Sequence, residues 1–396
     1  MRLSQDSLAM LLVCTNLAIP DRSSVKPLTP KEWLGVSQAL VKSPLKSPKG
    51  FFEYLDWDSV WGIDADLAKR VKSLLGFGGQ LGLELERLEQ MGVWVTTRVE
   101  DDYPVRLKQI LGIRSPLVLF GSGDKALLNH DAVAIVGSRN VGQDDMDFTT
   151  RLAECCVKSG FSIVSGGARG VDKTAETAAF NAGGHVISIS AGGFINELKT
   201  KEYREAVASG KLLLVTGDNP FSRFTVASAM IRNKYVYAFS KYAVVVSSGM
   251  NEGGTWAGVT ENLRAGWVPA FVRSDVDKPA HLALLGKGAH PITWADLTPE
   301  IGEYFSASSF SLADRVQEDS FQGIYPDLEK YLQTPRTIKE VAEEFKVPQD
   351  RAKEWLTEGV LSDKFVKKTK PVRYVSSDAA SGEQLSLMLE RATARR

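Results

Sequence analysis

The sequence predicts an α/β protein with a doubly wound, mostly parallel sheet, preceded by a helical module and followed by a winged helix. Short apolar runs at residues 132–136 and 161–164 show no polar alternation, which is typical of strands covered on both faces. A glycine-containing turn and a helical stretch follow each run, and this order indicates right-handed βαβ crossovers.

The two glycine turns of these units carry side chains suited to binding an anion. Their residues are Gly137, Ser138 and Arg139 in the first turn, and Ser165, Gly166, Gly167 and Arg169 in the second. Both turns are expected at the carboxyl edge of one sheet, where helix N-termini present N–H groups to phosphate. Two guanidinium groups there predict a site for a phosphate-rich ligand. The alternative is that the glycines only make tight turns and the arginines are solvated.

Composition limits where such a site can lie. The chain has 396 residues, with 48 basic and 48 acidic side chains, so an anion site must be a local patch. Cys14, Cys155 and Cys156 have no metal or disulfide spacing, which favours a reducing, cytoplasmic compartment. The apolar run 8–19 is too short to span a bilayer and lacks a cleavage pattern, so we expect a buried helix and no membrane partner.

Residues 1–91 are predicted to form the helical N-terminal module. Thr29, Pro30 and Glu32 make a capping box with proline at the first helical position. Apolar residues at helical spacing indicate further helices at 64–75 and 80–91, with the glycine-rich residues 76–79 between them. No catalytic constellation occurs in this module.

Residues 92–305 are predicted to form the sheet domain. We expect strands at 93–95, 117–120, 185–190, 211–215, 242–247 and 268–272, and helices at 104–110, 201–208, 224–239 and 255–265. A third glycine turn follows the strand 242–247 and contains Gly253, Gly254 and Thr255. No turn has the glycine spacing of a dinucleotide site or a P-loop, so no cofactor is expected.

A basic triplet, Arg232, Asn233 and Lys234, lies in the helix before that strand, beside Tyr235 and Tyr237. Basic residues interleaved with aromatic residues suit backbone contacts and base stacking on single-stranded nucleic acids. The alternative places the tyrosines between helix and sheet and leaves the triplet in solvent.

The C-terminal part is predicted to contain a linker at 306–324, a winged helix at 325–376 and a tail at 377–396. Thr337 and Glu340 form a capping box that opens a helix to residue 345, and a second helix begins at 348. Residues 365–366 and 373–375 are expected to pair as a hairpin. The hairpin region is basic, with Lys364, Lys367, Lys368, Lys370 and Arg373. The second helix is charge-balanced, so DNA reading and a protein-contact role both stay open.

With these motifs, the chain resembles the DprA family of DNA-processing proteins, also called Smf, whose central domain is Rossmann-like. The likeness is densest from residue 92 to residue 273. The sequences 133–139 and 165–172 resemble the two signature turns of the family, and the basic triplet resembles its Arg-Asn-Arg triplet. Glu176 stands where the family usually has histidine.

The resemblance implies a function and a set of site residues. It implies single-stranded DNA binding in a basic pocket, homodimerisation, and loading of a RecA-type recombinase during DNA uptake, as in natural transformation, or during recombination and repair. By this resemblance the pocket would be lined by Ser138, Arg139, Gly166, Arg169, Arg232 and Lys234.

Two other functions remain open. The same superfamily includes phosphoribohydrolases with a Gly-Gly-x-Gly-Thr-x-x-Glu turn; here Gly253, Gly254 and Thr255 lead to Glu261 at twice the threonine-to-glutamate spacing. Glu261 or Glu176 could act as a general acid or base if burial raised its pKa. The third function is a nucleotide sensor that binds a signal molecule at the sheet edge. We favour a DNA-binding protein without catalytic residues.

Overall fold

The computed structural model describes residues 2–20, 22–54, 64–309 and 321–379, except residues 346, 348, 362, 363, 370 and 378. The chain divides into two compact units, Met1–Ala307 and Ser308–Arg396. Most of the predicted tail 377–396 and much of the predicted linker 306–324 lie outside the described residues.

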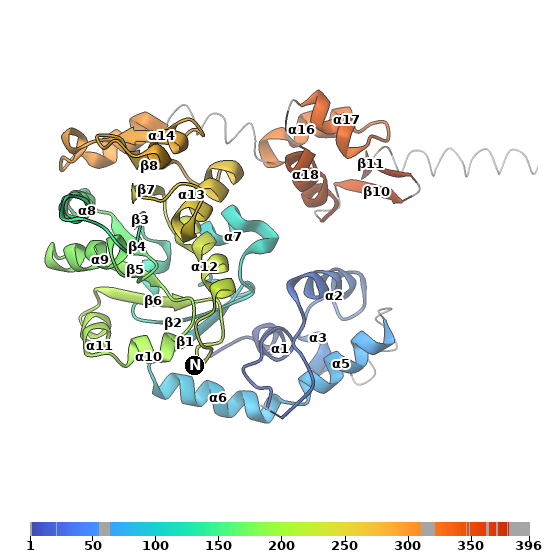
Figure 1. Ribbon diagram of the computed structural model, residues 1–396. Helices are drawn as coiled ribbons and strands as arrows, with labels where there is room; N and C mark the ends of the chain where they lie inside the picture. The colour runs from blue at the N-terminus through green and yellow to red at the C-terminus, as the bar shows by residue number, and fades with distance from the viewer. Residues whose placement is uncertain are drawn as a thin grey trace, which may run out of the picture. The chain divides into compact units, whose positions relative to one another are not determined.

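The first unit is built on a sheet with the strand order β1-β2-β6-β5-β4-β3-β7-β8-β9 (Figure 1). The strands are β1 (Trp94–Thr97), β2 (Val118–Ser122), β3 (Ala132–Gly137), β4 (Ser162–Ser165), β5 (Val186–Ile189), β6 (Leu212–Thr216), β7 (Tyr242–Ser247), β8 (Ala270–Arg273) and β9 (His290–Ile292). Strands β3 to β9 pair in parallel, whereas β1 and β2 extend one edge in antiparallel pairs. The predicted doubly wound, mostly parallel sheet is therefore confirmed.

Successive strand residues enter two different hydrophobic cores, which explains the continuous apolar runs in the sequence. Val133 and Ile135 of β3 belong to one core, and Ala132 and Ala134 belong to the other. Helices cover both faces (Figure 1). One core contains α8 (Gln143–Lys158), α9 (Val171–Asn181), α10 (Phe194–Leu198) and α11 (Lys201–Ala208), and the other contains α7 (Val105–Leu111), α12 (Val226–Ala238), α13 (Gly253–Ala265) and α14 (Pro279–Leu285).

The N-terminal helices share the α8 and α9 core. They are α1 (Gln5–Cys14), α2 (Pro30–Lys42), α3 (Gly50–Glu53), α5 (Ala65–Leu75) and α6 (Gly78–Gln90). The run 8–19 supplies the buried helix α1 as predicted, and the capping box of Thr29 and Glu32 is present. Helix α6 begins inside the predicted glycine break, because burial of Leu81 and Leu88 stabilises a helix that extends back to Gly78. In the described part of the chain no helix is long and apolar enough to cross a membrane.

The described residues of the second unit form three helices and a hairpin around a core of their own. They are α16 (Phe321–Tyr331), α17 (Ile338–Glu344), α18 (Gln349–Leu361), β10 (Phe365–Thr369) and β11 (Val372–Ser376). The capping box of Thr337 and Glu340 opens α17, and β10 pairs with β11 in antiparallel fashion, so both local predictions are confirmed. Leu328, Trp355 and Phe365 are buried in the core of this unit.

Candidate functional site

The winding of the sheet reverses between β3 and β7, and this switch point brings the three glycine turns together. β3 lies between β4 and β7, with parallel pairing on both sides. The Ser138 N–H donates to the Ser247 carbonyl at 3.0 Å, and the Thr255 hydroxyl donates to the Gly137 carbonyl at 3.0 Å. Open α/β sheets bind their ligands at such a point.

The first two turns pack directly against each other at Gly170. Its φ of +81° favours glycine, and a Cβ there would lie 2.4 Å from the Ser138 carbonyl oxygen and 2.6 Å from that of Arg139. The closeness of these turns, expected from consecutive parallel strands, is therefore confirmed.

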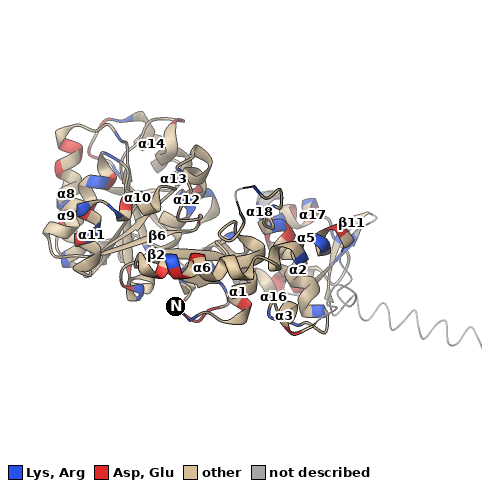
Figure 2. Cartoon of the chain, turned by 90° about the horizontal axis from the view of Figure 1, so that it is seen from below, with Lys and Arg blue, Asp and Glu red and all other residues tan. Residues whose placement is uncertain are grey.

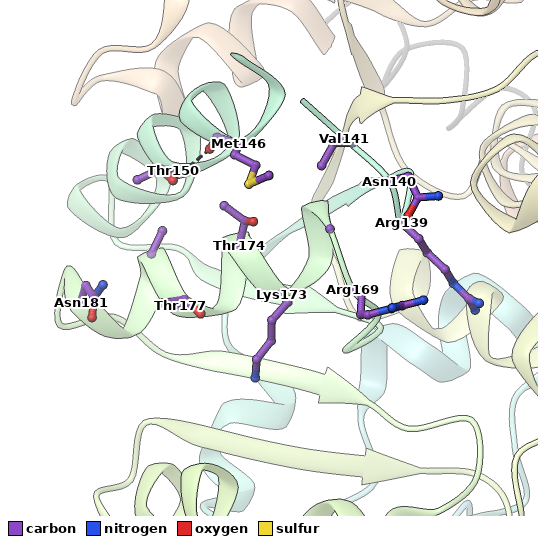
Figure 3. Close-up of a pocket in the computed structure, with 12 residues that line it drawn as sticks. Arg139, Asn140, Val141, Met146, Thr150, Arg169, Lys173, Thr174, Thr177 and Asn181 are labelled. Atoms are coloured by element: carbon purple, nitrogen blue, oxygen red, sulfur yellow. Dashed lines mark hydrogen bonds between the residues drawn. The ribbon is translucent and has the colours of Figure 1, made fainter. Parts of the chain in front are cut away.

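Arg139 and Arg169 are exposed side chains that extend from these two turns toward the same space (Figure 3). Neither has a hydrogen-bond or ion-pair partner within the described ranges. Figure 2 shows acidic and basic residues interspersed along the ribbon, in keeping with the zero net charge. The two guanidinium groups thus form a local cationic surface at the switch point, available for an anionic ligand.

Arg232, by contrast, is a buried cation behind the second turn. Its side chain is 8% exposed, and its Nε has no hydrogen-bond partner among the described residues. A Cβ on Gly166 would lie 1.3 Å from Nη1 of Arg232, so the guanidinium occupies the space that a side chain at this position would need. Burial lowers the pKa of Arg232, while the carboxylates of Asp172 and Glu197 oppose that shift.

A carboxylate from the start of α9, not predicted as a site residue, already occupies the second turn. Asp172 accepts hydrogen bonds from the N–H groups of Gly166 at 3.2 Å and Ala168 at 3.4 Å, and the Gly167 N–H donates to Ser165 Oγ at 3.0 Å. Burial raises the pKa of Asp172 to about 6, with Glu176 adding to the shift and Arg232 opposing it. The N–H groups of Gly166, Gly167 and Ala168 are therefore not free for a ligand, because the protein supplies their acceptors.

Glu176 of α9 lies next to the same turn, near Gly167, and is completely buried. Its carboxylate accepts hydrogen bonds from Ser188 at 2.9 Å and Tyr203 at 3.2 Å, and Lys173 Nζ is 3.5 Å away. Burial raises the pKa of Glu176. The group is a structural acceptor sealed from solvent, so it is poorly placed to exchange a proton with a bound substrate.

The basic triplet separates in the structure. Arg232 faces the second turn, Asn233 donates to the Gly254 carbonyl at 3.2 Å, and Lys234 forms an ion pair with Glu261 at 3.1 Å. Tyr235 and Tyr237 are 8% and 2% exposed in the core, so their predicted role in base stacking is wrong and the alternative is confirmed for the tyrosines. The other half of that alternative, a triplet left in solvent, is wrong, because Arg232 is buried and Lys234 is paired with Glu261. Of the four cations predicted to line the pocket (Arg139, Arg169, Arg232 and Lys234), Arg139 and Arg169 are exposed and have no hydrogen-bond or ion-pair partner within the described ranges.

A groove between α8 and α9 adjoins these two arginines (Figure 3). It has a volume of about 870 Å³ and is lined by Met146 and Thr150 of α8 and by Thr174 and Thr177 of α9, among others. The groove was not predicted from the sequence, although the small residues of α9 at helical spacing are a signal for it. No cluster of metal-ligating side chains occurs in the part of the chain that the structure describes.

The domain that carries this site matches a known protein family. The model of the family described as DNA recombination-mediator protein A matches residues 94–298, which include the whole nine-stranded sheet and the three turns. The chain belongs to this family. The family resemblance noted in the sequence is thereby confirmed.

Individual relatives agree with this assignment. The chain is 30% identical over 231 residues to a DprA protein of Mycobacterium tuberculosis, covering 54% of this chain and 58% of that protein. It is 30% identical over 154 residues to the DNA processing protein DprA of Bacillus subtilis, covering 38% and 51%. The chain thus matches little more than half the length of these relatives. DprA from Streptococcus pneumoniae has a similar fold, with a TM-score of 0.51 at 16% identity over 76% of this chain and 97% of that one.

Proposed function

We propose that this protein binds single-stranded DNA at the switch point of its sheet, with Arg139 and Arg169 as contacts to the phosphate backbone. The observation that supports this function best is the pair of exposed, partner-free guanidinium groups on adjacent turns. Neighbouring strands lie about 4.8 Å apart, so both groups can reach one phosphate or two successive ones. Membership in a recombination-mediator family agrees with a DNA ligand.

Salt dependence provides the test, because phosphate contacts release counterions. Binding of labelled single-stranded DNA is followed by fluorescence anisotropy at several salt concentrations. Arg139→Ala and Arg169→Ala should each weaken binding and flatten the slope of log affinity against log salt by about 0.7. The loss should be the same on all sequences, since phosphates carry no base identity.

Arg204→Ala is a matched control, because Arg204 is an exposed arginine on the neighbouring helix α11. It removes the same charge away from the switch point and should leave affinity and slope almost unchanged. Thermal unfolding shows whether the variants remain folded. Unchanged affinity and slope in both folded switch-point variants would place the DNA site elsewhere.

We further propose that residues 325–376 form a winged helix and that the central domain, residues 92–305, carries the main DNA site. The order of elements, with α17 and α18 followed by the hairpin β10–β11, supports this assignment. Lys364 directly before the hairpin and Lys367 and Arg373 within it make this region basic. By the family resemblance, the proposal extends to a homodimer in the cytoplasm that helps to load a RecA-type recombinase. Light scattering of the purified protein and a recombinase-loading assay on coated single strands test these two extensions.

A further inference from the structure

The groove between α8 and α9 results from small side chains on one helix. Gly170, Thr174 and Ala178 follow one another at intervals of four residues, so they lie on one face of α9. Thr174 faces Met146 and Thr150 of α8 across the groove (Figure 3), and Gly170 and Ala178 also line it. The resulting volume of about 870 Å³ lies within the range of ligand sites, which is about 300–1,000 Å³.

The groove lining combines Arg139 and Arg169 at one end with neutral polar groups along its length. Its third basic residue, Lys173, is paired with Glu202 at 2.6 Å and with Glu176 at 3.5 Å, so its charge is already compensated. Arg139 and Arg169 lie at its mouth, and none of the residues that line it is acidic. Thr150 donates its hydroxyl proton to the Met146 carbonyl at 2.9 Å, which leaves its oxygen lone pairs free to accept. Within the described ranges, the side chains of Thr174 and Thr177 have no hydrogen-bond partner.

These groups match the parts of a nucleotide that carry no charge. Hydroxyl groups can donate to and accept from base edges and sugars, and the Met146 thioether offers a polarisable apolar contact for a base face. The phosphate of the same nucleotide needs cations, which the groove has at its mouth.

We propose that this groove holds the sugars and bases of the nucleotides that follow the phosphate held by Arg139 and Arg169. This inference rests on the proposed single-stranded DNA binding. The strand enters at the two arginines and continues along α8 and α9. The groove increases affinity through uncharged contacts, so it lengthens the binding site without adding to the salt dependence.

The test fills the groove and measures affinity against oligothymidylates of increasing length. Thr177 is exposed at the groove, so Thr177→Trp can occupy it without disturbing the core. We expect wild-type binding on the shortest strands and a loss of about tenfold on longer ones, the size expected for one lost base contact. The salt slope should stay at the wild-type value. Ser209→Trp, at an exposed position outside the groove lining, is the matched control and should bind as the wild type does at every length.

A second measurement uses the unaltered protein. Oligonucleotides with a single photoactivatable thymidine analogue at successive positions should cross-link to peptides of α8 around Met146 or of α9 around Thr177. The groove proposal would be overturned if affinity depended on strand length in the same way in Thr177→Trp and wild type, and if no such cross-links formed. If Arg139→Ala still weakens binding in that case, the proposed function stands and only the strand path is wrong. A second outcome would also overturn the proposal: Thr177→Trp binds free nucleoside monophosphates more weakly than the wild type but binds oligonucleotides equally well. The groove would then be a site for small nucleotides.

Discussion

Asp172 offers a direct test of the electrostatics inside the second turn. Its carboxylate is 7% exposed, binds the N–H groups of Gly166 and Ala168, and faces the buried guanidinium of Arg232. Glu176 approaches from its own helix α9, while Glu197 and Arg139 act on Arg232 from other elements. The perturbation is Asp172→Asn, which keeps the size of the side chain and removes its titration.

The structure sets both the sign and the magnitude of the effect. Burial raises the pKa of Asp172 to about 6 in the folded protein, whereas an unfolded aspartate titrates at about 3.9. A raised folded pKa means that this contribution to stability is complete below about pH 4 and is lost as the pH rises through about 6. Two pKa units correspond to about 3 kcal/mol as an upper limit.

The assay is urea unfolding of wild type and Asp172→Asn at several values between about pH 4 and pH 7. The other carboxylates titrate in both proteins, so the difference between the two free energies of unfolding isolates Asp172. That difference should change by up to about 3 kcal/mol over the range, with the wild type losing stability relative to the variant as the pH rises. Parallel pH profiles would refute the reasoning and show that Asp172 does not titrate in this window.

Three further predictions concern the turn, the chemistry and the second unit. Gly166→Ala should lower the free energy of unfolding by about 1–3 kcal/mol, because the new methyl group overlaps the Arg232 guanidinium. Gly82→Ala is the control and should not lower the free energy of unfolding, because a Cβ there meets no atom within 4 Å. The loss should shrink in an Arg232→Ala background, and equal losses in both backgrounds would contradict the steric cause. Incubation of the protein with nucleoside monophosphates should release no free base above the level without protein, because Glu261 is paired with Lys234 and Glu176 is buried away from solvent. Base release that disappears in Glu261→Gln would show that the protein is an enzyme. Truncation after residue 317 should leave single-stranded DNA affinity within about tenfold, or 1.4 kcal/mol, of the full chain, and a larger loss would assign the basic hairpin to the main binding surface.

The sheet and its turns could be predicted because local sequence patterns determine them. Strands buried on both faces need apolar side chains at every position, and β3 shows this pattern. Parallel pairing of consecutive strands then places the turns of Arg139 and Arg169 side by side. The start of α6 was misjudged because a glycine pair weakens a helix only modestly, and burial of Leu81 and Leu88 outweighs that loss.

The different roles of the basic triplet could not be predicted from its own residues. Consecutive side chains on α12 point about 100° apart, so they meet different neighbours. Arg232 meets Gly166, Asn233 meets Gly254, and Lys234 meets Glu261. Each partner is distant in sequence, and the tertiary fold decides whether a basic residue is buried, bonded or exposed.

Asp172 did leave a signal in the sequence, and it bears on which anions the site can accept. An acidic residue in the first turn of a helix commonly binds the free N–H groups at the N-terminus, and Asp172 occupies this position in α9. A compact dianion such as a terminal phosphate is held best by a cage of N–H groups. In the second turn the N–H groups of Gly166 and Ala168 already donate to Asp172, whose negative charge would repel a second anion. Arg139 and Arg169, which extend outward, can still pair with the single charge of each phosphodiester. The site therefore favours the backbone of a strand over the terminal phosphate of a free nucleotide.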